Sequence, residues 1–192
     1  MKKTVLALVL ALSSFAAFAA VIDFDDLAGN ETALVADGYQ GFNWFNVGAI
    51  GADAYPGSGF ANGMTSAANV AFNHYGATVS ISRAGGFDFL GAYFASAWFD
   101  QELSFEGSRD GQVLYATGVS YVIDTLAPQW IALGWRGIDT LTIYNSSGTQ
   151  WAMDDFTVSV DAPAQVPEPG TLALTGLAAA GWLASRRRRP AR

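Results

Sequence analysis

The chain of 192 residues contains no cysteine and only one histidine. Without cysteine there can be no disulfide, no thiolate metal site and no cysteine nucleophile. One histidine, His74, cannot build a multi-histidine zinc site. No G-x-S-x-G motif is present to indicate a serine hydrolase. We therefore interpret His74, in the segment Phe72-Asn73-His74-Tyr75-Gly76, as a turn residue.

Basic residues are also scarce outside the two ends of the chain. From Ala20 to Gln165 there are three arginines, no lysine and sixteen acidic residues, a net charge of −13. A surface this acidic repels nucleic acid and anionic lipid headgroups, so we expect no nucleic-acid partner. The charge is compatible with calcium or with neutral polymers. It is equally compatible with a role in solubility alone.

The N-terminus has the parts of a secretory signal peptide. Lys2 and Lys3 precede an apolar run, and Ala17-Phe18-Ala19 fits the A-x-A cleavage rule. The apolar run is too short to remain as a membrane span. We expect residues 1–19 to direct the chain to the secretion translocon and to be removed.

The C-terminus combines a proline-bracketed acid, a short apolar run and a basic cluster. Two prolines hold the acid in an extended conformation, because proline fixes φ and disfavours helix in its predecessor. The pattern predicts a linker at 162–169, a short transmembrane helix at 170–185 and a basic tail at 186–192. The positive-inside rule keeps that tail in the cytoplasm and the rest of the mature chain outside. The bracketed motif is Pro167, Glu168 and Pro169, and the membrane-stop residues are Arg186, Arg187, Arg188 and Arg189.

These three parts, in this order, resemble the PEP-CTERM sorting signal of Gram-negative bacteria. The resemblance covers about the last 27 residues. It implies that a membrane-embedded exosortase recognises the Pro-Glu-Pro motif and cleaves near it. It further implies that the chain is anchored transiently and then reaches the cell surface or the extracellular matrix.

The residues between the ends predict an all-β domain. About ten strand-like segments are separated by turn residues, and no long amphipathic helix pattern occurs. Asp110-Gly111 predicts a hairpin, and Asn145–Gly148 predicts another. Phe87, Phe89, Gly91 and Tyr93 alternate as one face of a half-buried strand. We predict an antiparallel β-sandwich over residues 20–161.

The first and last predicted strands carry matching acidic pairs. Overall the pattern resembles the jelly-roll, galactose-binding-like sandwiches found among PEP-CTERM passengers and carbohydrate-binding modules. Sandwich domains often pair their terminal strands, which would bring the acids together. Converging carboxylates suit calcium, although solvent-facing strand ends explain them as well. No other cofactor is expected. The calcium candidates are Asp23, Asp25, Asp26, Asp154 and Asp155.

Exposed aromatic side chains are the candidates for sugar binding. Most tryptophans are at least half buried, so we expect one or two to be exposed, in the loops around Tyr55 and Trp98. A further candidate is the Tyr39–Phe45 stretch, where Asn43 and Asn46 lie beside aromatic residues. The carbohydrate-binding candidates are therefore Trp44, Tyr55 and Trp98.

Paired carboxylates could instead serve glycoside hydrolysis, which needs two acids about 5–10 Å apart. Asp100, Glu102 and Glu106 cluster near Trp98, but we expect the glutamates to flank a strand. The leading hypothesis is a non-catalytic surface or matrix protein that binds extracellular polysaccharide. The alternatives are a secreted glycan hydrolase or lyase, and a calcium-stabilised adhesin.

Overall fold

The computed structural model describes residues 18–27 and 33–160. The predicted linker, transmembrane helix and basic tail lie outside these residues, as do all but the last two residues of the predicted signal peptide. None of the helices in the described ranges has the length and apolar character needed to cross a membrane. The first strand begins at Phe18, so the predicted cleavage after Ala19 falls within it.

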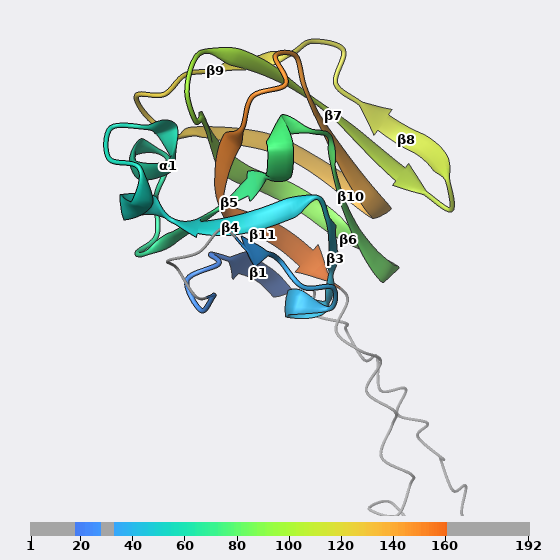
Figure 1. Cartoon of the computed structure of the whole chain (residues 1–192). Coiled ribbons are helices and arrows are strands. Elements are labelled where there is room, and N and C mark those ends of the chain that lie inside the picture. The colour runs from blue at the N-terminus through green and yellow to red at the C-terminus, as the bar shows by residue number, and fades with distance from the viewer. Residues whose placement is uncertain (1–17, 28–32, 161–192) are drawn as a thin grey trace, which may run out of the picture. The chain divides into compact units, whose positions relative to one another are not determined.

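The described residues form an antiparallel β-sandwich, as predicted (Figure 1). The strands follow the hydrogen-bonded order β2-β4-β5-β11-β6-β10-β7-β8, with β1 on β11, β3 on β6 and β9 on β7. Helix is limited to α1 (Gly59–Asn62) and three single 3-10 turns at 39–41, 52–54 and 74–76. The strands are β1 (Phe18–Ile22), β2 (Ala33–Leu34), β3 (Asn43–Phe45), β4 (Val47–Gly51), β5 (Asn69–Asn73), β6 (Val79–Ser96), β7 (Gln101–Arg109), β8 (Gln112–Ala116), β9 (Tyr121–Ile123), β10 (Gln129–Asn145) and β11 (Trp151–Val160).

Two long strands, β6 and β10, connect the layers of the sandwich. They pair along most of their length, with register shifts between Ala132 and Thr140. Glycines with positive φ stand at the bends of both strands, including Gly86 (φ 87°) and Gly137 (φ 66°). Glycine reaches this conformation without a Cβ clash, so the strands bend without ending. The sequence pattern predicts separate strands at 78–81 and 87–94 and at 130–133 and 141–144, and the structure joins each pair into one bent strand.

One predicted hairpin is confirmed and the other is wrong. Asp110 and Gly111 both have positive φ, 51° and 75°, which is the type I′ geometry, and they join β7 to β8. The loop Asn145–Gly148 joins β10 to β11, but these two strands are not neighbours. Strand β6 lies between them in the sheet. The loop is a connection across a strand and not a hairpin.

The predicted alternation of β6 changes face in the middle of the strand. Phe89 is fully buried, but the next core positions are Ala92 and Phe94, so the inward face shifts by one residue. The cause is a bulge against β11, where Phe89 and Gly91 pair with consecutive residues. Tyr93 consequently leaves the core and is partly exposed.

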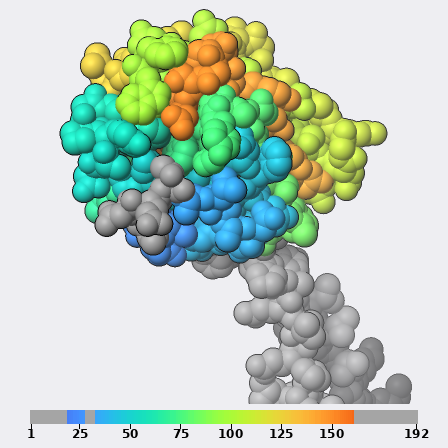
Figure 2. Space-filling view, viewed as in Figure 1, coloured from blue at the N-terminus to red at the C-terminus, as the bar shows by residue number. Residues whose placement is uncertain are grey.

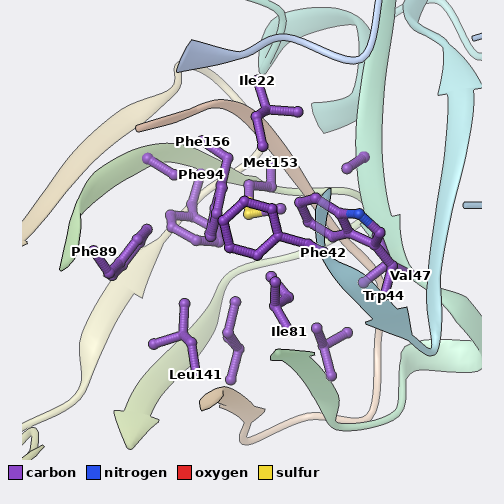
Figure 3. Packing of buried hydrophobic residues seen from close by; sticks show 14 of the residues in the cluster. Ile22, Phe42, Trp44, Val47, Ile81, Phe89, Phe94, Leu141, Met153 and Phe156 are labelled. Atoms are coloured by element: carbon purple, nitrogen blue, oxygen red, sulfur yellow. The ribbon is translucent and has the colours of Figure 1, made fainter. Parts of the chain in front are cut away.

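The main core is rich in aromatic side chains that meet edge to face (Figure 3). Phe42 packs on Phe87 with ring centroids 5.1 Å apart, and Trp44 packs on Phe156 at 5.4 Å. Burial of each such ring stabilises the fold by about 1.5–3 kcal/mol of transfer free energy, and the edge-to-face contact adds to this stabilisation. A domain without disulfides can be stable on this core alone.

A smaller second cluster lies under α1. It contains Phe60, Phe72 and Ala152 with Ile50, Ala52, Val70 and Ala97. Phe60 and Phe72 meet edge to face at 5.7 Å. This cluster fixes α1 against the ends of β6 and β11, and it forms the base of the site described next.

The terminal strands pair with each other, as the sequence predicted. β1 runs antiparallel to β11, with Ala20 opposite Val158 and Ile22 opposite Phe156. Asp23 directly follows Ile22 and Asp155 directly precedes Phe156. The two aspartates therefore lie at the same end of the β1–β11 ladder.

Candidate functional site

Tyr55 and Trp98, both singled out from the sequence, come together at the surface. Tyr55 is 45% exposed and Trp98 is 46% exposed. Their ring centroids lie 5.3 Å apart and the ring planes cross at 77°, so the two rings form a corner. In Figure 2 the segment around α1 (teal) adjoins the chain that follows β6 (light green) on the face in view. The sequence predicted each exposure but not the contact.

Phe60 is the floor of this corner. Its buried ring lies 5.9 Å from Tyr55 and 5.6 Å from Trp98, so it supports both exposed rings from the second core cluster. Ser58 caps α1, since its hydroxyl accepts the Phe60 N–H at 3.2 Å. A Cβ at Gly59 would stand 1.7 Å from a backbone oxygen of β6, so only glycine lets α1 approach this closely.

A hydrogen-bond network orients Trp98. The indole Nε1 donates to Gln150 Oε1 at 3.0 Å. Gln101 Nε2 donates to the carbonyl of Gln150 at 2.9 Å and to the Ser96 hydroxyl at 2.7 Å. Ser96 and Gln101 are buried, so the loop that carries Trp98 is held by satisfied polar groups. A fixed ring loses little conformational entropy when a ligand binds.

The corner opens on a hollow of about 340 Å³. This volume is within the range of small-molecule sites. Its wall combines the two rings with a proline, small residues and the polar groups of Ser58 and Thr125. An aromatic face with a few polar neighbours can pack against the C–H face of a sugar ring while hydroxyl groups remain hydrogen-bonded. The complete lining is Ala54, Tyr55, Pro56, Gly57, Ser58, Ala97, Trp98 and Thr125.

The prediction that the third aromatic candidate, Trp44, is exposed for sugar binding is wrong. It is only 2% exposed and belongs to the main core, so it has no free face for a sugar ring. In β3 the side chains alternate, with Asn43 and Phe45 outward and Trp44 inward. The indole Nε1 is satisfied by the backbone oxygen of Tyr39 at 2.9 Å. Phe45, which is 70% exposed, takes the outward position instead.

The acidic candidates lie in one region, but much of their bonding capacity is used within the protein. Asp154 is fully buried and accepts the backbone N–H groups of Thr65 and Ser66 at 2.7 and 2.8 Å, together with both hydroxyls. Asp25 accepts the N–H of Asn69 at 3.0 Å. Asp154 thus ties the loop after α1 to β11, which is a structural role.

The neighbouring carboxyl groups perturb one another. Burial raises the pKa of Asp155, the Thr65 hydroxyl partly opposes this, and the charges of Asp154, Asp23 and Asp25 raise it further. Burial and the hydrogen bond to Asp26 raise the pKa of Tyr39 well above its usual range. Within residues 18–27 and 33–160, however, no group of three or more acidic or histidine side chains is arranged to hold a metal ion.

The acids considered for hydrolysis do not form a pair in a cleft. Glu102 and Glu106 lie on β7, where the intervening core positions are Leu103 and Phe105. Four residues along a strand place their Cα atoms about 13 Å apart, whereas the two carboxyl groups of a glycosidase lie about 5–10 Å apart. Asp100 is exposed in the loop before β7.

Two other aromatic surfaces are less evident from the sequence. A hollow of about 640 Å³ lies between Phe45 and Tyr75 and includes Asn43 and Asn46. Its lining includes the last three residues of the Tyr39–Phe45 stretch singled out from the sequence, together with Asn46. The second surface pairs Trp130 with Tyr93, at 5.1 Å, on the outer face of β6 and β10. Only the bulge in β6 turns Tyr93 outward, so period-two reasoning could not find this surface.

Comparisons with known proteins identify the C-terminal segment. Residues 165–189 match the family described as the PEP-CTERM protein-sorting motif. The resemblance built on Pro167, Glu168 and Pro169 is thereby confirmed, and the chain carries a signal for exosortase-targeted export and membrane-anchored sorting. The sequence matches none of the curated proteins.

Two solved structures of carbohydrate-binding modules are similar to the chain. The first is the N-terminal CBM22-1-CBM22-2 tandem domain of Xyn10C from Paenibacillus barcinonensis, with 15% identity and a TM-score of 0.43. The similarity covers 84% of this chain and 51% of that chain, so this chain spans about half its length. The second is TmCBM61 in complex with β-1,4-galactotriose, with 9% identity and a TM-score of 0.36, covering 69% of this chain and 100% of that chain.

Proposed function

We propose that this is a cell-surface or extracellular-matrix protein of a Gram-negative bacterium, and that its sandwich binds extracellular polysaccharide without cleaving it. The observation that supports this most directly is the corner of Tyr55 and Trp98. Two large rings remain about half exposed although a buried position would stabilise them more. Their support by Phe60 and the Trp98–Gln150 hydrogen bond is typical of a preorganised binding surface.

The binding proposal is tested with the full chain in a detergent that contains no sugar headgroup. Binding to a panel of neutral oligosaccharides and to the producing cell's own exopolysaccharide is measured by titration calorimetry. We expect W98A to weaken binding about thirtyfold, which corresponds to about 2 kcal/mol for a central aromatic contact. W130A removes the exposed tryptophan of the separate Trp130–Tyr93 surface and so distinguishes the corner from that surface. Absence of binding across the panel, or equal losses in both variants, would refute the proposal.

The location is tested separately at the sorting motif. Replacing Pro167, Glu168 and Pro169 by alanine removes the extended acidic peptide but leaves the apolar run and the arginines. We expect the variant to be exported but to keep its tail and to stay in the inner membrane, as judged by fractionation and mass. Release and processing equal to those of the unchanged chain would contradict the proposed route.

A calcium-stabilised adhesin is a second candidate because of one buried atom. Asn69 Oδ1 has no hydrogen-bond partner among the described residues, while its Nδ2 donates to backbone oxygens of the Phe24–Leu27 segment. A carbonyl-type oxygen beside Asp25 is a ligand that calcium accepts. This candidate predicts that millimolar calcium raises the melting temperature by several degrees relative to chelator. An unchanged midpoint would remove it.

A further inference from the structure

The bend of β6 carries a further hollow, of about 420 Å³, whose lining is polar and charged. It is formed by Ser82–Gly86 of β6, the turn that joins β7 to β8, and residues 139 and 140 of β10. The hairpin at Asp110-Gly111 lies at the right of Figure 1, close to the lower end of β6. No aromatic side chain lines this hollow.

Two of the three basic side chains between Ala20 and Gln165 meet here. They are Arg83 and Arg109. Arg83 Nη1 donates to the backbone oxygen of Gly86 at 2.8 Å, and Arg109 Nη1 donates to that of Gly137 at 3.0 Å. Among the described residues, no protein acceptor bonds the Nη2 group of either arginine, so one edge of each fork is free.

The backbone is shaped to admit these side chains. A Cβ on Gly86 would stand 2.5 Å from Arg109 Nη1, so this glycine makes room for the guanidinium. Its φ of 87° is also a conformation that favours glycine. On the other side, the Arg83 guanidinium lies 6.0 Å from the ring centroid of the buried Phe42. Both charges are thus positioned by the fold.

The hollow also contains acceptors. Asp139 accepts the Asp110 N–H at 2.7 Å and the Thr140 hydroxyl at 2.9 Å, and its oxygens retain further lone pairs. Asp110, which is 89% exposed, lies 3.9 Å from Arg109 Nε. The site therefore presents two cationic forks next to carboxylate acceptors.

This combination selects among ligand classes. A neutral sugar would not use the two guanidinium groups, and a small inorganic anion would face the charges of Asp110 and Asp139. A sugar acid has a planar carboxylate for the arginine forks and hydroxyl donors for the aspartates. We propose that this hollow binds a uronate unit of an acidic polysaccharide. The site is distinct from the Tyr55–Trp98 corner and does not depend on the proposed function of that corner.

The test uses a matched pair of ligands and a matched set of variants. An oligogalacturonide and its fully methyl-esterified form, in which a neutral ester replaces each carboxylate, are titrated into the full chain in low salt. R83Q and R109Q each remove one fork. R136Q makes the same charge change at the third arginine, which does not line the hollow. R83K keeps the charge but loses the planar fork, and melting curves confirm that every variant is folded.

We expect the oligogalacturonide to bind and the methyl ester not to bind. R83Q and R109Q should each weaken binding about tenfold or more, the scale of a hydrogen bond to a charged group, and R83K should recover only part of the loss. R136Q should stay within about twofold of the unchanged chain, since the Arg136 side chain does not line the hollow. Absence of binding, equal binding of the ester or of inorganic sulfate, or an equal loss in R136Q would overturn the proposal. W98A should still bind the oligogalacturonide with unchanged affinity. That result would show that uronate binding does not depend on the Tyr55–Trp98 corner.

Discussion

The two candidate sites lie on different parts of β6 and are built by opposite means. Just beyond its C-terminal end, at Trp98, apolar rings remain exposed because Phe60 and a hydrogen-bond network hold them from behind. At its bend, beside Arg83, glycines make room for charged groups that bond backbone oxygens. The Tyr55–Trp98 corner presents an apolar surface that suits an apolar ligand face. The hollow at the bend presents two arginines beside two aspartates, in a domain that is otherwise strongly acidic. A polymer with neutral and acidic units could use both.

The largest expected effect is a separation of selectivity between the sites. W98A should lower the affinity for neutral glycan about thirtyfold and leave uronate binding unchanged, and R109Q should do the reverse. Raising the salt concentration from low to about 0.5 M should weaken uronate binding several-fold and leave neutral binding unaffected. Titration of both ligand classes into both variants checks this. Parallel losses for the two ligands would mean that the sites are one surface.

A smaller effect is expected from the support of the aromatic corner. Q150L removes the acceptor of the Trp98 indole N–H and should weaken neutral-glycan binding about threefold, the scale of one partly exposed hydrogen bond. Q150E keeps an oxygen at the same place and should bind like the unchanged chain. If both variants bind equally well, the hydrogen bond does not position the ring.

The smallest expected effect is a change in folding stability with pH. It matters for the uronate test because lowering the pH also neutralises the uronate carboxylate. Because the pKa of Asp155 is raised in the folded state, folding stability falls as pH rises from about 3.8 through the raised value. At neutral pH the ionised Asp155 is therefore unfavourable. Its φ of 51° is also a conformation that asparagine adopts readily.

D155N should accordingly melt about 2 °C higher at neutral pH, the scale that a few tenths of a kcal/mol produces in a domain of this size. The difference should shrink below about pH 3.8, where both proteins carry a neutral side chain. Melting curves across pH test this. A constant difference at all pH values would assign the gain to backbone conformation alone. D155N also removes one pH-dependent contribution to folding stability, so uronate binding can be measured across pH with less change in the stability of the protein.

The parts of the fold that depend on local chemistry could be predicted from the sequence. Asp110-Gly111 forms the expected turn because both residues tolerate positive φ. Asn145–Gly148 has similar composition but does not form a hairpin, because β6 inserts between the strands it joins. That insertion is a long-range pairing, which turn chemistry does not encode. The face change after Phe89 has the same origin, since it follows from the register with β11.

The same distinction applies to the candidate residues. Tyr55 and Trp98 are exposed as their loop context suggested, but their contact depends on how α1 packs on the end of β6. In the segment Asn43-Trp44-Phe45 the sequence does not indicate which aromatic residue points inward, and Trp44 proved to be the buried one. The arginine hollow was not foreseen, because Arg83 and Arg109 meet only through the pairing of β6, β10 and β7.

The position of β11 also constrains when the domain can acquire its structure. β11 pairs with β1, β5 and β6, and among the described strands it alone joins the β2-β4-β5 ladder to the rest of the sheet. It is also the last described strand, directly ahead of the sorting segment. A chain that is threaded across the inner membrane from its N-terminus therefore cannot complete its sheet until β11 has emerged. Until then the β2-β4-β5 ladder and the strands paired with β6 remain two separate parts of the sheet.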